Sequence, residues 1–270
     1  MARVLIFNGV NLFFASHLCE KSKLIIFHKL GLKIIINYKY MENVSFYCIN
    51  YKDELRKNKM ITRFDNLNIN LFFVDPVEKD DIRLEKIPNK GNLRVWSIML
   101  QHLDSIRHFL LNSTNEYCVV CEDDILISKD TANDFPEIIN TFNKLELDVL
   151  VLGYLVPYKI FDWFTYFPLK HRNDKYSFYE FPNDLWGSQM YMISRKQAKN
   201  LLEKYTVEYA LSTVDTETFS PDWTLTKNGR RSILYPMVAL EEGGSKSGVN
   251  SEEQYHYRCY ETNFVEDLYI

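Results

Sequence analysis

Three consecutive carboxylates, Glu122, Asp123 and Asp124, follow directly on an apolar, β-branched run that begins at Tyr117. Side chains alternate along an extended chain, so Glu122 and Asp124 would share one side and Asp123 would face the other. Two like charges held on one side repel each other unless a cation lies between them, and such oxygen ligands suit Mg²⁺ or Mn²⁺. The motif therefore predicts a divalent metal site, although a solvated acidic turn after a strand would have the same sequence.

Strand-like and helix-like segments alternate around this motif. Besides the run that ends in the motif, strands are expected at 44–51, 68–74, 148–155, 185–194 and 232–240. Apolar residues recur at helical spacing over 52–64, 93–111, 131–145 and 195–205. This alternation predicts an α/β fold with a mostly parallel central sheet flanked by helices. Such sheets bind ligands at the carboxyl ends of their strands, which is where the acidic motif lies.

The composition sets limits on the class of protein. The 270 residues have 46% hydrophobic and 25% charged content with a formal net charge of −4, which indicates a soluble globular chain and gives no reason to expect nucleic-acid binding. Five irregularly spaced cysteines argue against a disulfide framework, so we expect a cytoplasmic protein. A weak signal-like N-terminus keeps the lumen of the secretory pathway as an alternative. No apolar run is long enough to predict an integral membrane segment.

The chain is expected to have two parts. Residues 1–43 are interpreted as an N-terminal extension, because Met41 precedes what reads as a clean domain start, and residues 44–270 as the main domain. A chain shortened to begin at Met41 should then fold and act normally. Residues 156–184 carry many aromatic side chains without clear periodicity, and long irregular segments within a domain are often functional.

Several short motifs follow one another along the chain. Tyr47-Cys-Ile-Asn-Tyr is followed by Arg56, Phe73-Val-Asp75 ends the second expected strand, and Cys121-Glu-Asp-Asp-Ile contains the acidic motif. In this order they resemble glycosyltransferase family 25, the group of lipopolysaccharide sugar transferases and collagen galactosyltransferases. They are similar to that family's first strand with the arginine after it, its second strand end and its acidic motif. The resemblance covers roughly residues 44 to 245.

The later motifs add specificity to this resemblance. The segment 187–198, which runs from Gly-Ser-Gln-Met-Tyr-Met-Ile-Ser-Arg to an alanine, resembles the family's Gly-to-Ala segment closely, and Asp222 matches a downstream acidic position. Ser97 and His102 lie where the family often has a Ser-His pair, but here the two residues are not adjacent. The resemblance implies a nucleotide-diphospho-sugar transferase fold of the GT-A type.

The implied activity is metal-dependent, inverting transfer of a sugar from a nucleotide donor, with UDP as the family-level expectation, to an acceptor hydroxyl on a glycan or protein. The implied metal is Mn²⁺ or Mg²⁺, held by Asp124 with Glu122 or Asp123. His256 would be a further ligand by analogy with GT-A enzymes, or simply a packed side chain.

Inversion needs a base that takes the proton of the acceptor hydroxyl. Asp222 is the first choice, because Trp223 beside it could stack on a sugar face, and Glu241 and Glu242 are its competitors. Six further residues are expected to bind the donor: Asn50, Arg56, Asp75, Asp123, Gly187 and Gln189. Two other classes of protein stay open at this point, a non-catalytic sugar-binding protein of degenerate transferase fold and a metal-dependent phosphoester hydrolase.

Overall fold

The computed structural model describes residues 4–7, 10–13, 43–85, 93–161, 163–212, 219–243 and 250–270. Near the N-terminus, β1 (Val4–Phe7) and β2 (Val10–Phe13) pair with each other in antiparallel fashion. Most of the predicted extension 1–43 lies outside the described residues, so the domain boundary at residue 44 stays a prediction.

One eight-stranded sheet organises the rest of the chain, in the order β4–β3–β5–β10–β7–β11–β9–β8. Pairing is parallel for β4–β3, β3–β5 and β7–β11 and antiparallel for the other neighbours, so β10 and β9 run against the remaining six strands. This agrees with the expected mostly parallel α/β sheet. The strand bounds are β3 (Val44–Ile49), β4 (Leu71–Phe73), β5 (Tyr117–Glu122), β7 (Val149–Gly153), β8 (Leu169–Arg172), β9 (Ser177–Glu180), β10 (Met190–Ser194) and β11 (Arg231–Tyr235).

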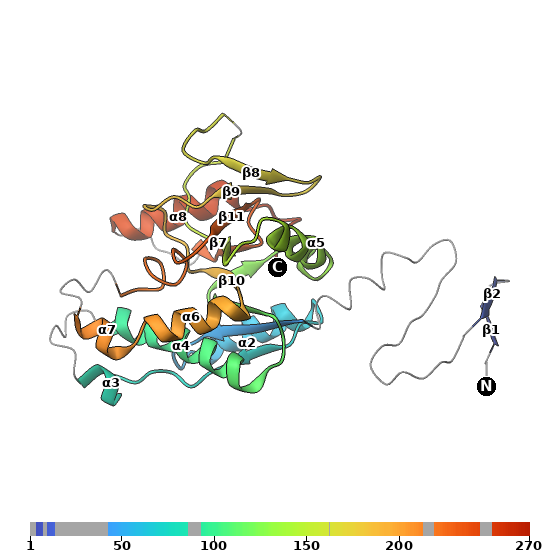
Figure 1. Cartoon of the computed structure of the whole chain (residues 1–270). Coiled ribbons are helices and arrows are strands. Elements are labelled where there is room, and N and C mark those ends of the chain that lie inside the picture. The colour runs from blue at the N-terminus through green and yellow to red at the C-terminus, as the bar shows by residue number, and fades with distance from the viewer. Residues whose placement is uncertain are drawn as a thin grey trace.

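Helices cover both faces of this sheet because its strands are apolar on both sides. Alternate residues of β3 and β5 belong to two separate core clusters. The first cluster includes side chains of α4 (Leu93–Asn112) and α6 (Arg195–Lys204), which lie next to each other in Figure 1. The second includes side chains of α2 (Glu54–Asp65) and α5 (Thr131–Lys144). The result is a three-layer α/β/α arrangement.

The sheet brings the predicted site residues to one edge. Because β3 and β5 are parallel neighbours, with Ile49 opposite Glu122, the residues that follow both strands meet at the same edge. The antiparallel β10 starts there, with Met190 opposite Cys121, which places residues 187–189 beside the acidic motif. After the motif, β6 (Ile125–Ile127) leaves the sheet and pairs with β12 (Ala239–Glu241). Helix α8 (Ser251–Asn263) follows β12 in the sequence and contacts it.

Three sequence-based expectations for the second half of the chain were wrong. The strand expected over 185–194 begins only at Met190, so residues 185–189 precede β10. The stretch 156–184 is not irregular throughout, because β8 and β9 within it pair and extend the sheet beside β11. The expected strand 232–240 is two strands in different sheets, β11 and β12, with Pro236 between them, since proline cannot donate a ladder hydrogen bond. The two short helices α3 (Ile82–Glu85) and α7 (Val207–Ser212) complete the described elements.

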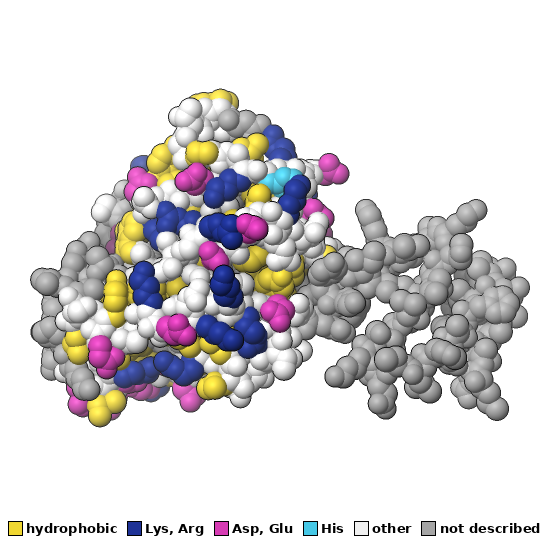
Figure 2. Space-filling model, in the orientation of Figure 1, with side chains coloured by type: hydrophobic (Ala, Val, Ile, Leu, Met, Phe, Trp, Pro, Cys, Tyr) yellow, Lys and Arg dark blue, Asp and Glu magenta, His cyan; other side chains and the backbone are white. Residues whose placement is uncertain are grey.

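Acidic and basic side chains are interspersed over the face drawn in Figure 2, without a single extended patch of one sign. None of the helices in the described ranges combines the length and the hydrophobicity that crossing a bilayer requires.

Candidate functional site

A pocket of about 510 Å³, hereafter the donor pocket, opens at the sheet edge where β3 and β5 end. All three carboxylates of the acidic motif line it, so the predicted division of the motif into two sides was wrong. Strand β5 stops at Glu122 and the chain turns through Asp123 and Asp124, so the alternation of an extended strand ends there. The lining residues are Ile49, Tyr51, Asp53, Arg56, Lys79, Leu93, Arg94, Ser97, Ile98, Gln101, Glu122, Asp123 and Asp124.

Two neighbouring side chains hold Asp123 in the donor pocket. Asn50 Nδ2 donates to Asp123 Oδ2 at 2.6 Å, and Arg56 Nη1 donates to Asp123 Oδ1 at 3.1 Å. The same Arg56 nitrogen lies 3.4 Å from Asp124 Oδ2. Asn50 is itself fixed, because the buried Gln101 donates from Nε2 to its backbone carbonyl at 2.9 Å. The turn between β3 and α2 is thus tied to the acidic motif and to α4.

Three cationic side chains, Arg56, Lys79 and Arg94, line the donor pocket together with its four carboxylates. Lys79 and Arg94 were not among the predicted binding residues. A signal for Arg94 was present, because Arg94, Ser97 and Gln101 recur at helical spacing and form a polar stripe on α4. The mixture of charges suits a ligand that carries several negative oxygens and also hydroxyl groups.

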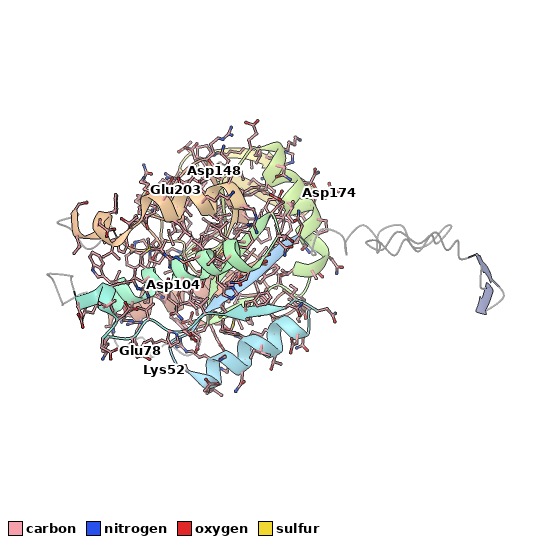
Figure 3. All side chains as sticks on the ribbon, turned by 60° about the horizontal axis from the view of Figure 1, so that its bottom comes forward. Lys52, Glu78, Asp104, Asp148, Asp174 and Glu203 are labelled. Atoms are coloured by element: carbon pink, nitrogen blue, oxygen red, sulfur yellow. The ribbon has the colours of Figure 1, made fainter. Side chains whose placement is uncertain are left out.

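The loop after β4 is held at the mouth of the donor pocket. Lys52 and Glu78 form an ion pair and lie side by side at one edge of the molecule in Figure 3. Tyr51 also donates from its hydroxyl to Glu78 Oε2 at 3.1 Å, while about half of its side chain stays exposed. These contacts keep Lys79 at the pocket and leave a tyrosine ring at its rim.

A second pocket of about 300 Å³, hereafter the acceptor pocket, adjoins the donor pocket and shares Glu122 and Ile98 with it. Two tryptophans, Trp186 and Trp223, form part of its wall, with ring centroids 6.3 Å apart and ring planes at 80°. The lining residues are Val95, Ile98, Glu122, Trp186, Ser188, Ser220, Pro221, Asp222 and Trp223.

Asp222, the predicted base, lies in the acceptor pocket. The backbone N–H of Gly187 donates to Asp222 Oδ1 at 2.8 Å, which ties residues 187 and 222 together. Burial raises the pKa of Asp222 above its ordinary value, while hydrogen bonds from Gly187 and Ser188 favour its charged form. Gly187 has no room for a side chain, because a Cβ there would lie 3.0 Å from Phe181 Cζ and 3.1 Å from Val151 Cγ1.

Glu122 lies where the two pockets meet. Ser188 Oγ donates to Glu122 Oε1 at 2.9 Å. Burial raises the pKa of Glu122 well above its ordinary value, and neighbouring carboxylates raise it further. Those neighbours are, in order of effect, Asp124, Asp222 and Glu241. The structure therefore gathers carboxyl groups at the junction of the pockets, where burial and mutual repulsion oppose the ionisation of Glu122.

The competing bases make other contacts. Glu241 Oε2 lies 2.6 Å from His256 Nδ1, and Glu242 Oε2 accepts from Arg63 Nη2 at 3.2 Å. Neither glutamate is among the described residues that line the acceptor pocket, whereas Asp222 is. Because Glu241 is opposite Ile125 in the β12–β6 pair, His256 reaches the neighbourhood of the acidic motif through Glu241.

The remaining predicted donor residues lie in different settings. Asn50 is buried and positions Asp123, and Gln189 is buried and accepts the Glu122 backbone N–H with its carbonyl at 3.0 Å. Asp75 is exposed and is not among the described residues that line the donor pocket. Of the separated Ser-His pair, Ser97 lines the pocket and His102 lies in the core.

The predicted metal can be compared with the side chains present. Within the described ranges, no three or more His, Cys, Asp or Glu side chains form a ready-made metal site. Mg²⁺, however, is commonly held by one or two carboxylates together with substrate phosphates. Glu122 and Asp124 line the donor pocket as such a pair, and their mutual repulsion is the kind that a cation removes. These two carboxyl groups therefore fit a metal ion that binds together with the phosphate groups of a substrate.

No family model matches the chain, and no curated protein matches it. Solved structures show a weak likeness over most of its length. One is a glycosyltransferase involved in the glycosylation of the major capsid of PBCV-1, with 9% identity and a TM-score of 0.37 over 81% of this chain and 98% of that chain. Another is the inositol-1-phosphate CTP transferase from T. maritima, with 11% identity and a TM-score of 0.35 over 85% of this chain and 84% of that chain.

A third similar structure is that of an apo UDP-glucose pyrophosphorylase, with 13% identity and a TM-score of 0.37 over 84% of this chain and 85% of that chain. At these scores and identities the likenesses assign neither a family nor a function to the chain. The resemblance to glycosyltransferase family 25 therefore stays a prediction.

Proposed function

We propose that this protein is a glycosyltransferase that moves a sugar from a nucleotide-sugar donor to an acceptor hydroxyl with inversion. The observation that carries the proposal is the pair of adjoining pockets that share Glu122. One pocket combines three cations with the acidic motif, and the other places Asp222 beside two tryptophans. A transfer reaction needs such an arrangement, because two substrates have to meet at one point.

The charges of the donor pocket suit the diphosphate of a nucleotide sugar. Arg56, Lys79 and Arg94 offer charge-assisted hydrogen bonds to phosphate oxygens. The exposed ring of Tyr51 at the rim offers a surface on which a nucleotide base can stack. UDP is the expected nucleotide, as the resemblance implies.

The predicted Mn²⁺ or Mg²⁺ would be held by Asp124 and Glu122, and when bound it would neutralise charge on the leaving diphosphate. Asn50 and Arg56 keep Asp123 in place beside this pair through hydrogen bonds to its two oxygens. His256 stays a predicted further ligand, which the contact with Glu241 brings near the motif.

In the proposed reaction the acceptor oxygen attacks the anomeric carbon from the side opposite the diphosphate. The bond between that carbon and the diphosphate oxygen breaks, and the nucleoside diphosphate leaves with the electron pair. Asp222 takes the proton of the acceptor hydroxyl, and burial, by raising its pKa, makes this carboxylate a stronger base. Hydrogen bonds from Gly187 and Ser188 hold this carboxylate in its orientation at the acceptor pocket.

The test measures release of UDP from a panel of UDP-sugars with Mn²⁺, with and without saccharide acceptors. Asp124→Asn is expected to lose metal-dependent turnover, and Asp222→Asn is expected to lose transfer while it still binds UDP. Asp174→Asn is the matched control, because Asp174 is an exposed carboxylate that is not among the described residues lining either pocket, and its loss should leave turnover unchanged.

Near-normal transfer by Asp222→Asn would show that the base is elsewhere. Turnover of simple phosphoesters but not of nucleotide sugars would favour the hydrolase that the sequence left open. Saccharide binding without any turnover of donor would favour the non-catalytic sugar-binding protein.

A further inference from the structure

The structure assigns a substrate class to the acceptor pocket: we infer that the acceptor is a carbohydrate whose terminal ring lies against Trp186 and Trp223. As a statement about the acceptor, this inference rests on the proposed function. The pocket volume of about 300 Å³ is at the small end of the range of small-molecule sites. A pocket of this size suits a single sugar ring as its occupant better than a segment of a folded protein.

The polarity of the acceptor pocket favours a sugar over other hydroxyl compounds. One side is aromatic. The polar groups of Glu122, Ser188, Ser220 and Asp222 line the rest together with three aliphatic side chains. A pyranose has a face of C–H groups that packs on an aromatic ring and an edge of hydroxyl groups that hydrogen-bond. A lipid chain offers no hydroxyl group to hydrogen-bond Glu122 and Asp222, and a single serine or threonine hydroxyl would bond only one of these two carboxyl groups.

The aromatic wall is held in place by its surroundings. Lys227 Nζ lies 3.7 Å from the ring centroid of Trp223, so a cation–π contact covers one face of the indole. Lys227 also donates to the backbone carbonyl of Asn183, and Arg231 Nη1 donates to the Lys227 carbonyl at 2.5 Å. A ring fixed in this way needs little ordering when a ligand stacks on it.

Trp186 approaches Trp223 from a different part of the chain. The hydrogen bond between Gly187 and Asp222 joins the residues that follow Trp186 and precede Trp223. That bond therefore sets the separation of the two rings and also the position of the predicted base. Trp186 remains 43% exposed, which is a large apolar surface to leave in water at the mouth of a pocket.

The experiment measures two kinds of binding on the full chain. Isothermal titration with UDP and Mn²⁺ reports on the donor pocket. Saturation-transfer NMR with a panel of methyl pyranosides, in the presence of UDP and Mn²⁺, reports on the acceptor pocket. The variants are Trp186→Ala and Trp223→Phe, and Trp163→Ala is the matched control because Trp163 is 71% exposed and outside both pockets.

We expect at least one methyl pyranoside to bind. Trp186→Ala should weaken it about tenfold, the order expected when one aromatic contact is lost. Trp223→Phe should weaken it less, since a smaller ring remains, and Trp163→Ala should not change it. UDP affinity should be the same in all four proteins.

UDP binding without any bound pyranoside, or pyranoside binding that both pocket variants retain in full, would overturn the inference and leave the proposed donor site intact. Absence of UDP binding would instead count against the proposed function. A pyranoside that still bound through the two tryptophans in that case would support the saccharide site on its own.

Discussion

His102 gives a prediction whose size follows directly from the structure. The side chain is fully buried in the core, with Nδ1 3.0 Å from the Tyr191 hydroxyl. Burial lowers the pKa of His102 from its ordinary 6.5 to about 3. The unfolded chain therefore binds a proton at this residue between about pH 6.5 and pH 3 that the folded chain does not. The contribution of neutral His102 to the free energy of unfolding is fully present above pH 6.5 and is lost as the pH falls through this window.

One pKa unit corresponds to about 1.4 kcal/mol, so lowering the pH from 7 to 5 should remove roughly 2 kcal/mol through His102 alone. Total stabilities of domains are commonly about 5 to 15 kcal/mol, so this loss is measurable. The assay is urea unfolding at both pH values for the natural protein and for His102→Gln. Glutamine does not titrate, so the stability of the variant should fall by roughly 2 kcal/mol less.

The carboxylates titrate in both proteins, so their contribution to the pH dependence of stability cancels when the two proteins are compared. Equal losses of stability between pH 7 and pH 5 would refute the reasoning. The same variant tests whether His102 has the functional role that the family's Ser-His pair would suggest. Because His102 lies in the core and outside both pockets, folded His102→Gln should retain transferase turnover, measured as UDP release at neutral pH.

Three further predictions concern the pockets. Gly187→Ala should lower the free energy of unfolding, measured in urea, by about 1 to 3 kcal/mol and should also reduce turnover. The new Cβ would press on Phe181 and Val151 and shift the backbone that holds Asp222. An unchanged free energy of unfolding would contradict this. Arg56→Gln should raise the Kd for UDP about tenfold by calorimetry, since one charge-assisted hydrogen bond is lost, and an unchanged Kd would exclude Arg56 from the site. Treatment with EDTA should stop turnover and added Mn²⁺ should restore it, whereas turnover that survives EDTA would contradict the predicted metal.

Local periodicity predicted much of this fold. The long apolar stripe of residues 93–111 is α4, which runs one residue further, and the expected strands around residues 44 and 149 are β3 and β7. The acidic motif was placed correctly at the end of a buried strand, because a short β-branched run that stops abruptly at charged residues is typical of a strand that leaves the core. Each of these features depends on residues close together in the sequence.

Features that depend on distant contacts were not predictable in the same way. The sequence offered no sign that Trp186 would meet Trp223, since the bond between Gly187 and Asp222 that joins their segments forms only in the folded chain. Lys79 belongs to a charged loop with no periodicity. The ion pair between Lys52 and Glu78 holds this loop beside the pocket. The turn at Asp123 likewise depends on partners far away in the sequence, Asn50 and Arg56.

The cluster of carboxyl groups at the junction of the pockets is hard to account for by folding stability alone. Glu122 is costly to ionise because it is buried and because Asp124, Asp222 and Glu241 lie nearby, and this repulsion would be weaker if the carboxylates were apart. A protein can lower that cost by placing cations nearby, and Arg56 does so for Asp123 and Asp124. The hydrogen bond that Glu122 accepts from Ser188 comes from a neutral hydroxyl, which brings no positive charge to lower the cost of ionising this carboxyl group. If the proposed function holds, the predicted cation would bring positive charge to this point, and that gain on binding would offset the cost of assembling the carboxyl groups there.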